Sequence, residues 1–256
     1  MSSGRPAGLG NDLREFLAFV RRPTLARRRP TAMGLPVDNG RADWLRLPRL
    51  RRMLLWAGLL WLISLLVFAP MIVGVTERGG ATHRLVLHQW LWLHAIVWAP
   101  VTEELVFRYW LRRPWLGAAL LPPLIVVLVN GPTWWTGSLL TLVLAVLWWP
   151  RTRHHVPRRA WRPLRWYRRF FPWIFHLSAL GFASMHLINF NLGHLSWWLM
   201  PVLVLPQWLA GLALGWIRVR AGIGAAMVLH GIYNAGPVMV LMLVMWLFPS
   251  GSMSGM

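Results

Sequence analysis

Long apolar segments, divided by short stretches rich in arginine, recur along the chain from Met53 to Phe248. A helix needs about 20 mostly apolar residues to cross a bilayer core, where the backbone can satisfy its own hydrogen bonds only in helices or closed barrels. Such segments are expected at 53–75, 85–110, 117–130, 134–149, 172–188, 197–217 and 223–248. With 57% hydrophobic residues and 20 Trp, the sequence predicts an all-α, polytopic transmembrane bundle of about seven spanning helices.

The distribution of arginine predicts how this bundle is oriented. The formal net charge is +20, and all 27 basic residues are Arg. In a seven-span arrangement nearly all of them fall on one side, in residues 1–52, 112–113, 151–169 and 218–220. Because cytoplasmic loops are enriched in Lys and Arg, we expect a cytoplasmic N-terminus and a basic cytoplasmic face that attracts anionic lipid. Loops between membrane spans suit nucleic acid poorly, so no nucleic-acid partner is expected.

The chain is expected to divide into a tail and one membrane domain. Residues 1–52 combine arginines with Pro and Gly and predict a basic cytoplasmic tail, with a short surface helix around Asp12 to Val20. Residues 53–250 form the transmembrane domain. The first 52 residues lack the apolar core of a cleavable signal. The absence of Cys excludes disulfides and thiolate sites, and together with the abundance of Trp and Arg it suggests a bacterial inner (plasma) membrane protein.

Two adjacent carboxylates, Glu103 and Glu104, stand inside one of the apolar segments. An ionisable side chain at membrane depth costs roughly 2.5 to 3.5 kcal/mol, so it needs a partner and usually has a function. Arg108 follows Glu104 by four residues and can pair with it on one helix face, whereas Glu103 faces a different neighbour. Pro100 is expected to kink or restart the helix just before the carboxylates.

Polar residues at helical spacing also mark two later apolar segments. Phe182 and His186 are four residues apart, as are His230 and Asn234, so each pair can share a helix face. A single His or ion pair in a bundle is often only structural, but a bundle that only had to pack would need none of these groups. Plain packing is expected in the sixth segment, where glycines at 211 and 215 have the spacing that lets helices approach closely.

These groups suit the hydrolysis of an acyl bond. A carboxylate in a low dielectric can act as general base towards water, and a facing His can orient that water. A second His with an Asn can donate to the oxyanion that develops on the scissile carbonyl. Alternatively, Glu103, His186 and His230 form an N/N/O set suited to Zn²⁺, although no His-Glu-x-x-His motif is present. A proton-coupled transporter could use the same groups as a relay, but no inverted repeat is evident.

The order of these motifs resembles a known family, the CPBP family of CAAX proteases and bacteriocin-processing enzymes, which is related to the Ras-converting CAAX endopeptidase. The motifs are Glu103-Glu104-x-x-x-Arg108, Phe182-x-x-x-His186 and His230-x-x-x-Asn234. The resemblance covers a core of about residues 97–237. It implies an all-helical intramembrane endopeptidase that hydrolyses a peptide bond in a membrane-associated protein or peptide substrate.

The resemblance also implies roles for the motif residues. Glu103 and His186 would activate the water, and His230 with Asn234 would form the oxyanion site. The residues that support the site or bind the substrate would be Glu104, Arg108 and Phe182. Two mechanisms fit this set: a glutamate-dependent one without a cofactor, and a metalloprotease in which Glu103, His186 and His230 hold Zn²⁺ or another divalent metal. The alternative function is a non-catalytic protein of the same fold, which binds at the membrane or confers immunity to a peptide toxin (bacteriocin).

Overall fold

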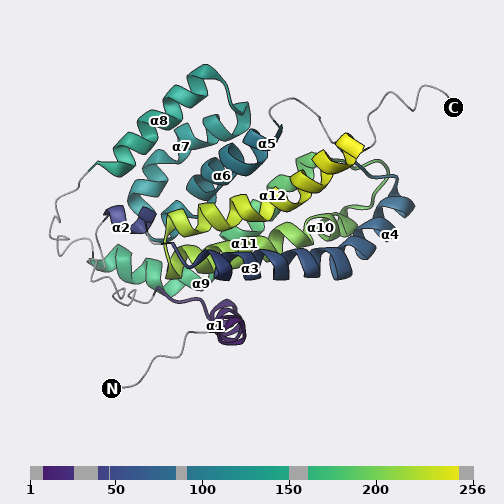
Figure 1. The fold of residues 1–256 in the computed structure, drawn as a ribbon. Coiled ribbons are helices and arrows are strands. Elements are labelled where there is room, and N and C mark those ends of the chain that lie inside the picture. Colours follow the sequence, from purple (N-terminus) through teal and green to yellow (C-terminus); the bar gives the residue numbers. More distant parts are fainter. Residues whose placement is uncertain (1–7, 26–39, 46, 85–90, 150–160, 248–256) are drawn as a thin grey trace.

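The computed structural model describes residues 8–25, 40–45, 47–84, 91–149 and 161–247, which are mostly α-helical (Figure 1). The α-helices are α1 (Leu9–Arg21), α2 (Gly40–Leu45), α3 (Leu50–Ile63), α4 (Ala69–Gly79), α5 (Leu91–Leu93), α6 (Ala99–Phe107), α7 (Pro114–Asn130), α8 (Trp134–Trp148), α9 (Trp161–Met185), α10 (Met200–Leu203), α11 (Leu205–Arg220) and α12 (Ile223–Leu247). Short 3₁₀ turns cover Tyr109–Leu111, His186–Asn189 and Trp197–Leu199. The prediction of an all-α protein is confirmed.

The two strands, β1 (Thr82–His83) and β2 (Phe190–Asn191), pair antiparallel and join the loop after α4 to the loop after α9. Thr82 lies opposite Asn191 in this register. The backbone N–H of Arg84 extends the contact by donating to Asn189 O at 2.7 Å. The 3₁₀ turn that begins at His186 leads directly into β2, so this small sheet anchors the end of the turn.

Within the described residues, three continuous helices are long and apolar enough to cross a membrane: Leu50–Gly79, Pro163–Asn189 and Ile223–Leu247. A bent pair, Trp197–Leu203 with Leu205–Arg220, would make a fourth span. The apolar helices α7 and α8 have only 17 and 15 residues, and at about 1.5 Å per residue they are shorter than a bilayer core of about 30 Å. By length and composition, the described residues therefore contain three or four candidate spans, and the predicted count of about seven stays a prediction.

Two elements differ from the expected boundaries. The arginine-rich stretch before the fifth segment is not a loop throughout, since α9 already begins at Trp161; Pro163 is tolerated because a first helical turn needs no intrahelical donor there. The sixth segment is broken by 54° between α10 and α11. Pro206 stands in the first turn of α11 and cannot donate to the carbonyl four residues earlier, so the break separates two helices instead of kinking one.

Helices α9 and α11 pack closely through the glycines predicted for this purpose. A Cβ at Gly215 would lie 2.7 Å from the Phe175 ring, and one at Gly211 would lie 3.2 Å from Ala179 O. Figure 1 shows α3, α11 and α12 running side by side, with α6, α7 and α8 forming a second group beside them. The site motifs lie on α6, α9 and α12, where these groups meet.

The N-terminal helix expected around residues 12–20 is present as α1, and it packs against the bundle. Phe16 and Phe19 are 5% and 3% exposed and belong to the same apolar cluster as Trp56 and Trp216. Asp12 is buried and forms an ion pair with Arg52. The rest of the expected tail lies partly outside the described residues.

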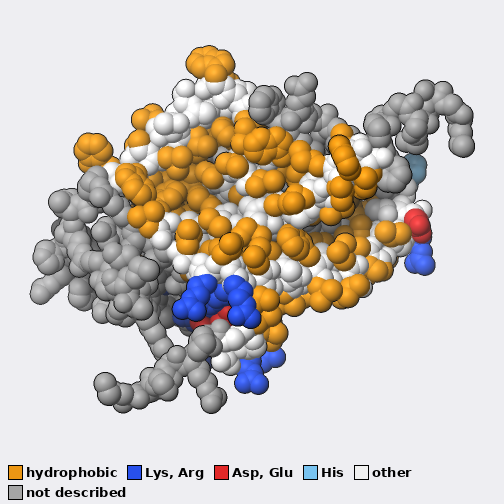
Figure 2. Space-filling model, viewed as in Figure 1, with side chains coloured by type: hydrophobic (Ala, Val, Ile, Leu, Met, Phe, Trp, Pro, Cys, Tyr) orange, Lys and Arg blue, Asp and Glu red, His pale blue; other side chains and the backbone are white. Residues whose placement is uncertain are grey.

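Apolar side chains cover most of the face in Figure 2, whereas charged side chains gather near α1 and near the end of α4. Exposed apolar residues include Leu65 and Leu66 after α3 and Met239 and Val240 on α12. Water would not stabilise so large an apolar face, but lipid tails would. The distribution of side chains agrees with a membrane protein.

Candidate active site

Helix α6 carries both carboxylates of the central motif and buries them. Glu103 is 8% exposed and Glu104 is fully buried. The helix does not restart at Pro100 as expected. It continues from α5 through a π-helical turn, His94–Trp98, that widens the helix just before the proline.

The ion pair predicted from the four-residue spacing is present. Arg108 Nη1 donates to Glu104 Oε1, and both side chains are buried. The same oxygen is 3.0 Å from His230 Nδ1. Because a carboxylate oxygen only accepts, the His230 proton on this side must be on Nδ1. Glu104 therefore fixes the orientation of His230 as well as balancing Arg108.

His230 lies between the two carboxylates. Its Nε2 is 3.7 Å from Glu103 Oε2, which is buried and has no hydrogen-bond partner among the described residues. With Nδ1 protonated, a neutral His230 would direct a lone pair at this carboxylate. A proton on Nε2 or on Glu103 removes that repulsion.

The ring of Phe182 on α9 is the centre of the site. The Arg108 guanidinium carbon lies 3.9 Å from the ring centroid, a cation–π contact. The His186 and His230 rings are 4.8 Å and 5.6 Å from it, both edge-on. Phe182 thus contacts Arg108 just after α6, His186 just after α9 and His230 on α12, without contributing a reactive group.

His186 begins the 3₁₀ turn at the end of α9. Its Nδ1 is 2.8 Å from the carbonyl oxygen of Phe182, so Nδ1 carries a proton and Nε2 is the lone-pair nitrogen of the neutral ring. A nitrogen in that state can accept a proton or orient a water molecule. The side chain is only half-buried, which leaves it accessible.

Asn234 contacts the π-helical turn. In such a turn a carbonyl accepts from the N–H five residues later, and for Ala95 that residue is Pro100, which has no N–H. Asn234 Nδ2 supplies a donor to Ala95 O at 2.9 Å. A Cβ at Gly231 would lie 2.8 Å from Ile96 O, so only glycine permits this approach of α12. Sequence reasoning missed this contact, although Pro100, Gly231 and Asn234 were its signal.

The predicted metal ligands do not form a metal site. Among the residues that the structure describes, no three His, Cys, Asp or Glu side chains are grouped so that they could hold an ion. Glu103 and His230 face each other, and His186 uses its Nδ1 on a backbone carbonyl, which leaves Nε2 as its remaining nitrogen. The metalloprotease mechanism therefore stays a prediction.

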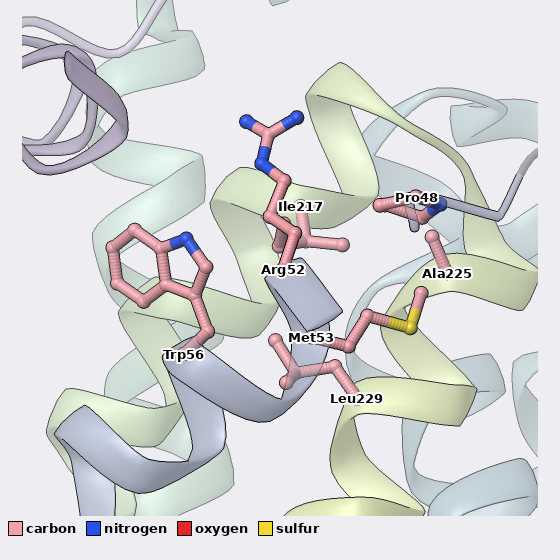
Figure 3. A pocket seen from close by; sticks show the side chains of 7 residues that line it. All are labelled: Pro48, Arg52, Met53, Trp56, Ile217, Ala225 and Leu229. Atoms are coloured by element: carbon pink, nitrogen blue, oxygen red, sulfur yellow. The ribbon is translucent and has the colours of Figure 1, made fainter. Parts of the chain in front are cut away.

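A shallow pocket lies elsewhere, between α3, α11 and α12 (Figure 3). Its lining is mostly apolar and consists of Pro48, Arg52, Met53, Trp56, Ile217, Ala225 and Leu229. None of the predicted site residues lines it. We assign it no part in the chemistry.

Comparison with known proteins identifies one family. The family model described as type II CAAX prenyl endopeptidase Rce1-like matches residues 85–236, which is more than half of the chain. All of the motif residues described above fall within the match. Neither the curated proteins nor the solved structures include a match to this chain.

Proposed function

The chain belongs to the Rce1-like family of type II CAAX prenyl endopeptidases, and we propose that it is an intramembrane endopeptidase that cuts a peptide bond in a membrane-associated protein or peptide. One observation supports this most strongly. Among the described residues the Glu103 carboxylate accepts no hydrogen bond and has only the 3.7 Å contact with His230, inside an apolar bundle. Glu104 also leaves one buried oxygen without a partner, but Arg108 and His230 hold its other oxygen. A general base needs a free oxygen for water, and Glu103 is the carboxylate that offers one without a competing partner.

Glu103 and His186 would activate the water. A water molecule bound to the free Glu103 oxygen gives its proton to the carboxylate as its oxygen attacks the scissile carbonyl. His186, with its lone pair on Nε2, would orient this water. When the tetrahedral intermediate collapses, the proton passes from Glu103 to the leaving nitrogen. The products are a new C-terminal carboxylic acid, which ionises by passing its proton to the new amine or to water, and that amine; Glu103 is ionised again.

His230 and Asn234 would stabilise the oxyanion of the intermediate. Protonated His230 can donate from Nε2 while Glu104 holds its Nδ1 at 3.0 Å. Asn234 uses one amide hydrogen on Ala95 O and has a second one to donate. Donors fixed in advance by the protein are worth most in a site without bulk water. Arg108 balances the negative charge of the two carboxylates.

We further propose the topology expected from arginine, with about seven spans, a cytoplasmic N-terminus in a basic tail of residues 1–52, and a protease domain at 53–250. The short helices α7 and α8 and the bent α10–α11 pair would then cross or partly cross the bilayer. Anionic lipid would contact the arginine-rich face. The membrane would be the inner membrane of a bacterium.

Cleavage of membrane-anchored peptides tests the proposal. Detergent-purified protein is incubated with a panel that includes a prenylated CAAX peptide and its unprenylated counterpart, and mass spectrometry locates the cut. We expect wild-type protein to cleave at least one peptide and Glu103→Gln to cleave none while remaining folded. Protection of cells from a peptide toxin by Glu103→Gln, with no cleavage by the wild type, would instead establish the immunity function.

A further inference from the structure

A second buried cation, Arg218 on α11, contacts the end of the helix that carries the carboxylates. Its side chain is fully buried. Nε donates to Arg108 O at 3.0 Å, and Nη2 donates to Tyr109 O at 3.1 Å. Nη1 forms an ion pair with Asp43 of α2 at 2.6 Å. Three nitrogens of one planar group therefore reach three different acceptors.

The position of these carbonyls explains why a cation is placed there. Helix α6 ends at Phe107, and the last carbonyls of a helix lack intrahelical donors and carry partial negative charge. Arg218 adds side-chain donors and positive charge to two carbonyls just beyond this end, each of which also accepts from the backbone N–H three residues later, at 3.2 and 3.4 Å. One of them belongs to Arg108, whose side chain holds Glu104. The backbone of the motif arginine is thus held by Arg218, and its side chain by Glu104.

A second arginine makes the opposite connection. Arg112 Nε, from the segment after α6, donates to Val219 O near the end of α11 at 2.9 Å. Arg218 therefore donates from α11 to the segment after α6, and Arg112 donates from that segment back to α11. The aromatic ring of Tyr109 adds a contact, since the Arg218 guanidinium carbon lies 5.6 Å from its centroid.

Asp43 completes this arrangement from outside the family-matched region. Its helix α2 lies directly against the start of α12, where a Cβ at Gly222 would be 2.3 Å from Asp43 O and one at Gly224 would be 1.9 Å from Trp44 O. Gly222 also has a φ of 153°, which favours glycine. Helix α2, which precedes the first long helix, therefore packs closely against the start of α12, the helix that carries His230.

We propose that Arg218, held by Asp43, is a positioning residue for the hydrolysis: it fixes the end of α6 so that Arg108 holds Glu104, and Glu104 in turn holds His230. This inference rests on the proposed function. If the ion pair were purely structural, its substitution would change only the stability of the fold, and exchange of a buried pair for apolar residues is often neutral or stabilising. A positioning role instead predicts slower catalysis in a protein that remains folded.

The test compares Arg218→Lys with Arg220→Lys. Arg220 lies two residues further along α11 and pairs with Glu15 of α1 at 3.0 Å. Lys keeps the charge but has one nitrogen, which cannot replace the planar three-way contact. Because small misplacements in an active site are costly, we expect Arg218→Lys to lower kcat about tenfold with KM within about twofold. Arg220→Lys should leave both unchanged.

Hydrogen exchange followed by mass spectrometry supplies a readout besides activity. In Arg218→Lys, amides of residues 105–112 should exchange faster than in the wild type, while those of α9 and α12 keep their rates. This result stands even if the wild type cleaves no peptide, in which case only the proposed function fails. Unchanged exchange at 105–112, or a wild-type kcat, would overturn the proposal.

A second variant covers the case in which Arg218→Lys does not fold. Asp43→Leu/Arg218→Met removes both charges together, and the same losses of kcat and exchange protection are expected. If this double variant folds and cleaves at the wild-type rate, the positioning role is wrong. If neither variant folds, the pair is structural and the proposal is also wrong.

Discussion

At the scale of single residues, the site contains two buried carboxylates and few groups that can balance their negative charge. Glu104 and Arg108 are fully buried and pair through one oxygen and one nitrogen, while among the described residues Glu103 has only a 3.7 Å contact with His230. The spacing of four residues was enough to predict the first pair. The contact between Glu104 and His230 joins residues 126 positions apart, so no local spacing could reveal it.

Removal of Arg108 should destabilise the fold through its partner. Arg108→Met leaves Glu104 as an uncompensated buried charge, a loss of about 3 to 5 kcal/mol. The double variant Glu104→Gln/Arg108→Met should recover most of this stability because it removes both charges. Denaturant unfolding of the purified proteins in detergent measures the free energy of unfolding of both variants. A double variant no more stable than Arg108→Met would contradict this explanation.

At the scale of elements, the π-helical turn before α6 is what places the carboxylates. The turn depends on Asn234, which donates to Ala95 O, and on Gly231, whose missing side chain leaves room for Ile96 O. The sequence predicted that Pro100 would disturb the helix, but it did not predict a continuous helix with a widened turn. That outcome depends on donors from α12, and a proline by itself does not show where such donors lie.

Gly231→Ala should disturb this junction. A Cβ there would lie 2.8 Å from Ile96 O, so α12 must shift away from the turn, and we expect a loss of about 1 to 3 kcal/mol in stability. The shift would also move His230, lowering kcat by about tenfold or more. The matched control is Gly58→Ala on α3, which meets no atom within 4 Å. Equal effects of the two substitutions on kcat and unfolding would contradict the prediction.

At the scale of the whole molecule, the apolar segments predicted the all-α class and most helix positions. They did not predict that α9 begins at Trp161 or that the sixth segment is bent by 54°, because both depend on neighbouring helices and on prolines in specific turns. The pair of Asp43 and Arg218 spans 175 positions. Such long-range contacts follow only from the packed bundle.

Labelling of introduced cysteines tests the proposed orientation. The chain has no Cys, so a single substitution supplies the only thiol. An impermeant maleimide added to intact bacterial cells should label His194→Cys, on the proposed outer side, and should label Arg165→Cys only after the membrane is permeabilised. Both positions are exposed. The reverse pattern would show that the N-terminus lies outside.

The most direct test of the central claim is single-turnover cleavage by Glu103→Gln beside Glu77→Gln, each with and without a chelator. Glu77 is an exposed carboxylate near the end of α4 and serves as the matched control. If Glu103 activates the water, Glu103→Gln should lose at least about a thousandfold in rate, while Glu77→Gln and chelator-treated wild type keep theirs. Wild-type rates in Glu103→Gln would contradict the account, and loss of activity in chelator alone would favour a metal held at this site.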